Sequence, residues 1–107
     1  MSRITHRKLV RDRIPEMIEA SGKTCVTRTL DDAAYLAALD QKLTEELAEY
    51  QQDKSAEELA DLLEVMMAVA EARGYGFGMI EQLRREKAQV RGGFGDHIWL
   101  EAVDTPD

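Results

Sequence analysis

The sequence has 107 residues, of which 44% are hydrophobic and 33% are charged, and its formal net charge at pH 7 is −7. A chain of this length fits one domain, residues 1–107, with a single modest core. The acidic balance argues against a nucleic-acid partner, which needs a basic surface to displace counterions. An aromatic content of 6% is low for an all-β protein. We therefore expect a mainly all-α fold.

Targeting and membrane signals are not evident in the sequence. No segment approaches the roughly 18 apolar residues of a membrane span, and the basic N-terminal end lacks an apolar run of signal-peptide length. We expect a cytoplasmic protein with no membrane partner. The lone Cys25 cannot form a disulfide within the chain.

The first half of the chain predicts a short helix, a strand and a long helix. Residues Ile14 to Ala20 form the short helix, since Pro15 is tolerated in a first turn and Gly22 is a C-terminal stop. Residues 25–30 alternate in the manner of a β-strand. Asp31 or Asp32 then caps a long helix that ends near Asp53.

The second half predicts two more helices and a second strand. Ser55 caps a helix that stops at Gly74, and glycines then turn the chain into a fourth helix over residues 78–90. Residues 97–103 alternate again, so they are expected to pair with residues 25–30 as a minor two-stranded element.

The two long helices carry two pairs of carboxylates that mirror each other about the turn between them. In an antiparallel hairpin, Glu46 lies level with Asp61 and Glu49 lies level with Glu58. The two levels differ by about 4.5 Å of helix rise, and packed helix axes lie about 8–10 Å apart, so the four side chains can converge. Converging carboxylates repel unless a cation lies between them, and an all-oxygen site suits Mg²⁺, Mn²⁺ or Ca²⁺. The spacing predicts a hard-metal site.

Two structural alternatives compete with this prediction. Acidic helix faces are usually solvated, and 21 of the 107 residues are Asp or Glu. Helical phase argues against simple solvation, because Glu58 falls inside the apolar arc of its helix and a buried carboxylate is costly unless it is paired or bound to metal. The second alternative is a capping box between Ser55 and Glu58, which is compatible with a metal site and does not involve Glu46, Glu49 or Asp61.

Basic residues gather toward the two ends of the chain and leave the acidic helices between them. The clusters comprise Arg3, Arg7, Lys8, Arg11 and Arg13, then Arg84, Arg85, Lys87 and Arg91. This split suits a metal-bound polyphosphate, whose remaining oxygens would bind Lys and Arg. The alternative for the second cluster is the preference for cations in the last turn of a helix.

The third predicted helix has an apolar arc that covers nearly half its circumference and extends through Leu63, Met67 and Ala70. One facing helix cannot cover so wide an arc. Two hairpins joined in a four-helix-bundle-like core would bury it, so we expect a homodimer or a dimer of dimers.

Several motifs resemble one enzyme superfamily. Residues 45–49 (EELAE) and 58–61 (ELAD) resemble the Glu-Glu-x-x-Glu and Glu-x-x-Asp signature of the MazG-like nucleoside triphosphate pyrophosphohydrolases, an all-α superfamily. The flanks, residues 8–15 (KLVRDRIP) and 91–94 (RGGF), resemble a subgroup described as phosphoribosyl-ATP pyrophosphohydrolase-like. Together these motifs span most of the chain.

The resemblance implies Mg²⁺-dependent cleavage, with Mn²⁺ as the other candidate metal, between the α and β phosphates of a nucleoside triphosphate. The products would be a monophosphate and pyrophosphate. The residues that match metal ligands are Glu46, Glu49, Glu58 and Asp61. Glu45 matches the first glutamate of the signature, and its implied catalytic role is to hold a second metal or to orient the attacking water. Lys87 and Arg91, with Lys8 and Arg11, are the candidates for phosphate binding.

The chain also departs from the superfamily pattern. Only residues 50–57 separate the two signature segments, so the hairpin is short, and the nucleotide pocket is reduced or is completed by a partner subunit. The alternative is a non-catalytic helical protein that binds a cation or nucleotide. Pyrophosphate release with and without a chelator distinguishes the two.

Overall fold

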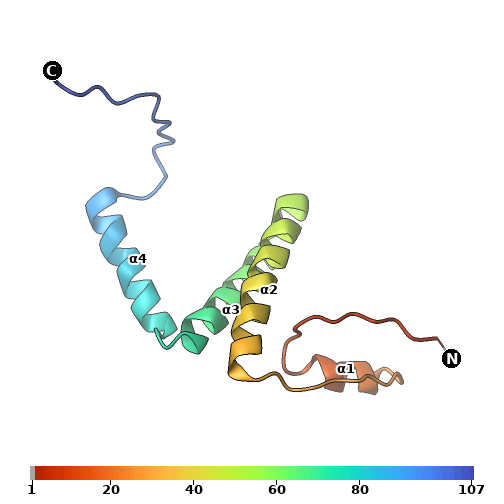
Figure 1. Cartoon of the computed structure of the whole chain (residues 1–107). Coiled ribbons are helices and arrows are strands. Elements are labelled where there is room, and N and C mark those ends of the chain that lie inside the picture. Colours follow the sequence, from red (N-terminus) through yellow and green to blue (C-terminus); the bar gives the residue numbers. More distant parts are fainter. Residues whose placement is uncertain (1) are drawn as a thin grey trace.

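The structure is a computed structural model and describes residues 2–107. It contains four helices in the order α1 (Ile14–Ala20), α2 (Asp32–Asp53), α3 (Ala56–Ala72) and α4 (Phe77–Arg91). The all-α prediction is confirmed for this range, and each helix begins and ends within two residues of its predicted bounds. Helices α2 and α3 form an antiparallel hairpin, and α4 leaves the far end of α3 at an angle (Figure 1).

Side-chain caps explain where the two long helices begin. The Asp31 carboxylate accepts a hydrogen bond of 2.8 Å from the backbone N–H of Ala34, and the Ser55 hydroxyl accepts one of 3.2 Å from that of Glu58. Each cap satisfies one amide that the first turn of a helix leaves without a partner.

The turn between α2 and α3 is only two residues long and depends on a left-handed residue. Lys54 has φ +58° and ψ +24°, and its N–H donates to the carbonyl of Tyr50 at 2.7 Å. The Lys54 ammonium also lies 5.5 Å from the centre of the Tyr50 ring. This conformation reverses the chain immediately, so that α3 packs directly back along α2.

Few side chains are buried in one chain. Among the described residues, the buried ones are Leu39, Glu46, Val65 and Ala70, all of them on the hairpin. An ion pair of 2.9 Å between Arg73 and Asp40 closes the end of the hairpin that lies far from the turn. Beyond it, Gly74 and Gly76 adopt φ of +82° and +76°, which lets the chain turn into α4.

The predicted two-stranded element is absent from residues 2–107. Residues 25–30 lie beside α1, where the Cys25 thiol is 3.9 Å from the carbonyl oxygen of Pro15. Residues 97–103 lie beyond α4 at the opposite end of the molecule (Figure 1). The two alternating segments therefore do not meet within one chain, and a strand without a partner has no ladder of hydrogen bonds to stabilise it.

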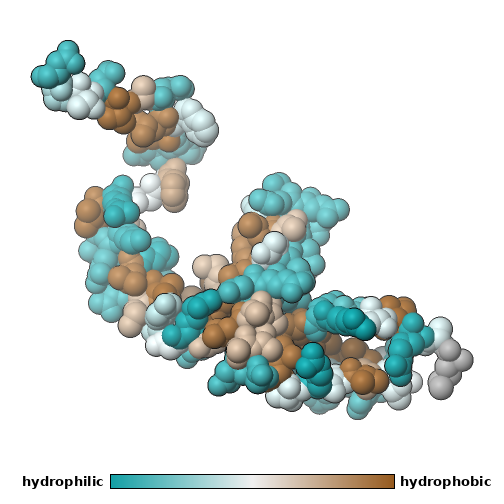
Figure 2. Space-filling model, in the orientation of Figure 1, coloured by the Kyte–Doolittle hydropathy of each residue, from teal (hydrophilic) through white to brown (hydrophobic). Residues whose placement is uncertain are grey.

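The chain is extended, and much of its apolar surface is exposed. Its principal extents are 72 × 31 × 25 Å and its radius of gyration is 19.4 Å, whereas a compact domain of about 100 residues has a radius near 13 Å. Apolar side chains remain exposed on α3, α4 and the C-terminal segment, residues 92–107, as the brown areas of Figure 2 illustrate. Trp99, for example, is 83% exposed.

No helix within residues 2–107 combines the length and the apolar character that crossing a lipid bilayer would require.

The cap of α2 gives a direct test of the fold. Replacing Asp31 with Ala removes the acceptor for Ala34 N–H, and we expect a loss of about 1 kcal/mol, equivalent to a fall of several degrees in the melting temperature of a chain this size. Asp31→Asn is the matched control, because asparagine caps equally well. Equal melting temperatures for the two variants would contradict the role of this cap.

Candidate metal centre

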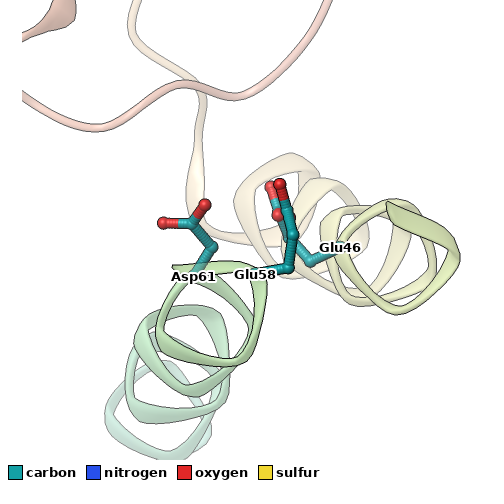
Figure 3. A group of neighbouring side chains, drawn as sticks. All are labelled: Glu46, Glu58 and Asp61. Carbon is teal, nitrogen blue, oxygen red and sulfur yellow. The ribbon is translucent and has the colours of Figure 1, made fainter. Parts of the chain in front are cut away.

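Three carboxylates converge between α2 and α3 near the turn of the hairpin. Glu46 comes from α2, whereas Glu58 and Asp61 come from the first two turns of α3 (Figure 3). Each of the three offers one oxygen, and these oxygens all lie within 4.8 Å of one another. The antiparallel hairpin therefore brings together three of the four predicted metal ligands.

Helical periodicity explains why two of these carboxylates point inward. Glu46 follows the buried Leu39 by seven residues on α2, and Glu58 precedes the buried Val65 by seven residues on α3. Seven residues are close to two helical turns, so each glutamate continues the seam of its helix. Each occupies a position where an apolar residue would pack in an ordinary hairpin.

Two carboxylate oxygens of this group are buried without a hydrogen-bond partner. They are Oε2 of Glu46 and Oε2 of Glu58, and Glu46 as a whole is only 7% exposed. The other oxygen of Glu46, Oε1, lies 3.5 Å from the Lys42 ammonium. Buried polar atoms are nearly always paired, and an unpaired buried carboxylate is costly. These two oxygens are therefore suited to a ligand that supplies positive charge.

Glu49 lies beside the three carboxylates but is exposed and outside the tightest group. Its charge still reaches them. The pKa of Glu58 is raised to about 7, mainly by burial of the carboxyl group. Its hydrogen bond with Glu49 and the negative charge of Glu49 raise the pKa further, and the charges of Asp61 and Glu46 add smaller contributions. Burial and then repulsion from Glu49 likewise raise the pKa of Glu46, against the opposing effect of Lys42.

The half-buried Glu45, the predicted catalytic residue, lies at the edge of the site. Its carboxylate is 3.8 Å from the ammonium of Lys42, which also faces Glu46. Lys42 was not among the predicted site residues. Its spacing of three and four residues from these two glutamates on one helix is the signal that could have identified it.

The two basic clusters differ in whether they contact the three carboxylates. From the first, the Arg11 guanidinium lies 2.6 Å from Asp61 Oδ1, and the N-terminal segment passes over this face of the hairpin (Figure 3). Lys8, in the same segment, is exposed and makes no ion pair within residues 2–107.

The second cluster lies on α4, which packs against α3 but not against α2 in the described chain. Arg84 and Arg85 both form ion pairs with Glu81. These contacts, above all the hydrogen bond that Arg84 donates, lower the pKa of the Glu81 carboxyl to about 2. Lys87 and Arg91 are exposed near the C-terminal end of α4, a helix that diverges from the hairpin (Figure 1). One chain therefore does not bring these two phosphate candidates to the acidic site.

The donor set fits a hard divalent cation. All three convergent groups are carboxylates, and no histidine or cysteine joins them within residues 2–107. Oxygen-only donors favour Mg²⁺, Mn²⁺ or Ca²⁺ over softer metals. The buried oxygens of Glu46 and Glu58 would gain the electrostatic partner that they lack in the protein alone.

No family model matches the sequence, and no solved structure matches it. A curated protein of Mycolicibacterium smegmatis, described only as uncharacterized, is 69% identical over 42 residues. This match covers 39% of the present chain and 43% of that protein. The chain thus matches less than half the length of this relative, whose description names no activity.

The raised pKa of Glu58 predicts how stability depends on pH without metal. Between about 4.5 and 7, the unfolded carboxyl has lost its proton while the folded one retains it. The folded state then binds more protons, so the contribution of Glu58 to stability falls as pH rises through this window. We expect melting temperatures in EDTA to fall from pH 5 to pH 7.5, and millimolar Mg²⁺ to reverse the loss by binding the native state.

Glu58→Gln should flatten this pH profile, because the amide cannot ionise and does not repel its neighbours. Glu57→Gln is the control, since Glu57 is exposed on the same helical turn. A melting temperature at pH 8 that responds neither to Mg²⁺ nor to EDTA would count against a metal centre.

Proposed function

We propose that the protein is a Mg²⁺-dependent nucleoside triphosphate pyrophosphohydrolase, with Mn²⁺ as an alternative metal. The observation that carries this proposal is the convergence of Glu46, Glu58 and Asp61 with two buried carboxylate oxygens that have no partner. The resemblance of residues 45–49 and 58–61 to the MazG-like signature connects this acidic group with nucleotide chemistry.

Each residue has a proposed part in the reaction. Glu46, Glu58 and Asp61 would hold the metal, with Glu49 beside them as the fourth ligand. A bound Mg²⁺ would supply positive charge to the phosphate oxygens and make water easier to deprotonate. Glu45 would orient the attacking water and accept its proton.

The proposed reaction is a simple displacement at phosphorus. The water oxygen bonds to the α-phosphorus, and the bond from that phosphorus to the oxygen bridging the α and β phosphates breaks. Pyrophosphate and a nucleoside monophosphate are released. The chain's contribution is positioning and electrostatic stabilisation, since exposed cations such as Lys8 and Arg11 would bind phosphate oxygens that the metal leaves uncovered.

One observation favours a second candidate, a non-catalytic protein that binds a cation or nucleotide. Lys87 and Arg91 are remote from the carboxylates within one chain. A second copy of the chain would have to supply them if they serve the site. Pyrophosphate release from a mixture of nucleoside triphosphates, abolished by EDTA, would support the enzyme. Mg²⁺ or nucleotide binding without such release would support the second candidate.

Two ligand variants test the enzyme directly. Glu46→Gln and Asp61→Asn keep side-chain shape while removing one anionic ligand each. We expect Mg²⁺ affinity and pyrophosphate release to fall together by at least about a hundredfold, since even partners outside the ligand shell are worth about tenfold to a hundredfold.

The stability of the same variants separates metal ligands from ordinary ion-pair partners. Breaking a buried ion pair commonly costs about 3–5 kcal/mol. Burial and repulsion at Glu46 outweigh its ion pair with Lys42, so their relief should leave Glu46→Gln unchanged or more stable in EDTA. Asp61→Asn also loses its exposed pair with Arg11, which is worth at most about 1 kcal/mol. Glu57→Gln should retain both activity and stability. Full activity in both ligand variants would refute the assignment.

We further propose that the protein works as a homodimer or a dimer of dimers. The single chain exposes 9923 Å² of accessible surface, whereas a compact monomer of its mass exposes about 6,000 Å². The excess is several times the area of about 800 Å² that one partner buries in a standard interface, which favours an obligate assembly. Exposed apolar residues on α3, among them Leu59, Leu63 and Met66, would lie in the interface.

Charge placed in this apolar face should disrupt the assembly. In a symmetric dimer each interface residue occurs twice, so Leu63→Glu would bury two unpaired charges and weaken association by at least about a hundredfold. Glu64→Gln, one residue along the same helix, should leave assembly intact. Sedimentation velocity measures the oligomeric state of both variants. A wild-type protein that sediments as a 12.1 kDa monomer at micromolar concentration would exclude this proposal.

A further inference from the structure

Arg11 is a basic residue that the fold brings to the three carboxylates from outside the hairpin. Its guanidinium Nη2 lies 2.6 Å from Asp61 Oδ1, although the two residues are 50 positions apart in sequence. Both side chains are solvent-accessible, with exposed fractions of 55% for Arg11 and 42% for Asp61. The contact therefore joins the rim of the acidic group to a segment that has no other ion pair with the hairpin within residues 2–107.

We infer that Arg11 is an exchangeable counter-ion of this carboxylate group. Its guanidinium neutralises Asp61 while no metal is bound, and gives way when a divalent cation takes that carboxylate. The released guanidinium then binds a phosphate oxygen of the incoming ligand. This second half rests on the proposed function, whereas the competition with metal requires only that the carboxylates bind a cation.

The strength of the ion pair is suited to exchange. Ion pairs between exposed side chains contribute about 0.2–1 kcal/mol, because water and salt screen them and because two long side chains must be ordered. A divalent cation among three carboxylates interacts with all of them at once, so it can displace a single guanidinium from Asp61. A deeply buried pair would instead hold Asp61 permanently and oppose metal binding.

The backbone at Arg11 is anchored while its side chain is free to reorient. The Arg11 carbonyl accepts a hydrogen bond of 3.1 Å from the N–H of Ile14, at the start of α1. The base of the side chain is thereby fixed near the carboxylates, and its three methylenes allow the guanidinium to move. The guanidinium can therefore dissociate from Asp61 and still remain near the carboxylates.

The chemistry of arginine fits both partners. The planar guanidinium presents paired N–H donors that match the two oxygens of a carboxylate and the oxygens of a phosphate equally well. The segment around it is also basic. Residues 2–13 carry five Arg or Lys residues against one Asp, namely Arg3, Arg7, Lys8, Arg11 and Arg13 against Asp12. A phosphate at the metal would therefore meet a positive segment.

The test uses Arg11→Gln and Arg11→Lys, with Arg3→Gln as the control. Arg3→Gln changes net charge as Arg11→Gln does, and Arg3 makes no ion pair within residues 2–107. Calorimetric titration at low salt measures two affinities for each variant of the full chain: that for Mg²⁺ alone, and that for inorganic pyrophosphate in saturating Mg²⁺. Melting temperatures in EDTA and in saturating Mg²⁺ complete the set.

Exchange predicts opposite changes in the two affinities of Arg11→Gln. Mg²⁺ alone should bind about twofold to fivefold more tightly, because the competing ion pair is gone. Pyrophosphate should bind about tenfold to a hundredfold more weakly, because a charge-assisted hydrogen bond is lost. Arg11→Lys, which keeps the charge, should have nearly wild-type Mg²⁺ affinity and intermediate pyrophosphate affinity. Arg3→Gln should change the Mg²⁺ affinity and the pyrophosphate affinity less than Arg11→Gln does.

A merely structural Arg11 would give a different pattern. Arg11→Gln would then lower the melting temperature equally in EDTA and in Mg²⁺, whereas exchange predicts a difference in EDTA that disappears in Mg²⁺. If the wild type binds Mg²⁺ and Arg11→Gln binds it equally or more weakly, the inference is overturned and the proposed function stands. If Arg11→Gln binds Mg²⁺ more tightly but no nucleotide releases pyrophosphate, the competition with metal stands and the proposed function fails.

Discussion

Repulsion between carboxylates held in the seam of a helical hairpin is the constraint on which the rest of the structure depends. Glu46 and Glu58 occupy positions that continue the buried seam through Leu39 and Val65. Negative charges placed there oppose the packing that brings α2 and α3 together. A cation bound there, as proposed, would relieve the repulsion and would therefore favour the packed arrangement of the two helices.

The remainder of the hairpin must hold these groups together. The two-residue turn at Lys54 limits how far the helices can separate near the site, and the ion pair between Arg73 and Asp40 joins them at the other end. Between these points only Leu39, Val65 and Ala70 are buried apolar residues. Such a small core gives little hydrophobic stabilisation within one chain, so a contribution from metal or from a second copy would be large relative to the total.

Local sequence signals predicted the helices and most of the acidic group. Asp31 and Ser55 cap the N-termini of α2 and α3, as their side chains predict. The mirrored spacing of acidic residues about a short turn identified Glu46, Glu58 and Asp61 as neighbours. Glu49 is less close, because it is three residues from Glu46 on α2 and therefore about 60° away around the helix. Only one of the two can point directly along the seam.

Features that depend on distant contacts could not be predicted from the sequence. The alternating residues 25–30 and 97–103 indicated strands, but alternation does not reveal whether a partner lies within reach, and in one chain these segments lie at opposite ends. The ion pair of Arg11 with Asp61 has no local signal either, since 50 residues separate them. Lys42 is different, because its spacing from Glu46 on one helix would have sufficed.

Most basic residues lie in the N-terminal segment and on α4, whereas the hairpin carries few of them, Lys42 among these. A cation fixed permanently among Glu46, Glu58 and Asp61 would satisfy them and remove their affinity for a divalent metal. Lys42 comes nearest to this role, yet at 3.5 Å it faces only the Oε1 atom of Glu46 and leaves Oε2 without a partner. Arg11 is joined to Asp61 only through an exposed contact, and Lys87 and Arg91 extend on α4 away from the carboxylates. In the proposed function, the acidic group would therefore remain available to a divalent metal, and the basic residues outside it would bind the phosphate ligand that arrives with this metal.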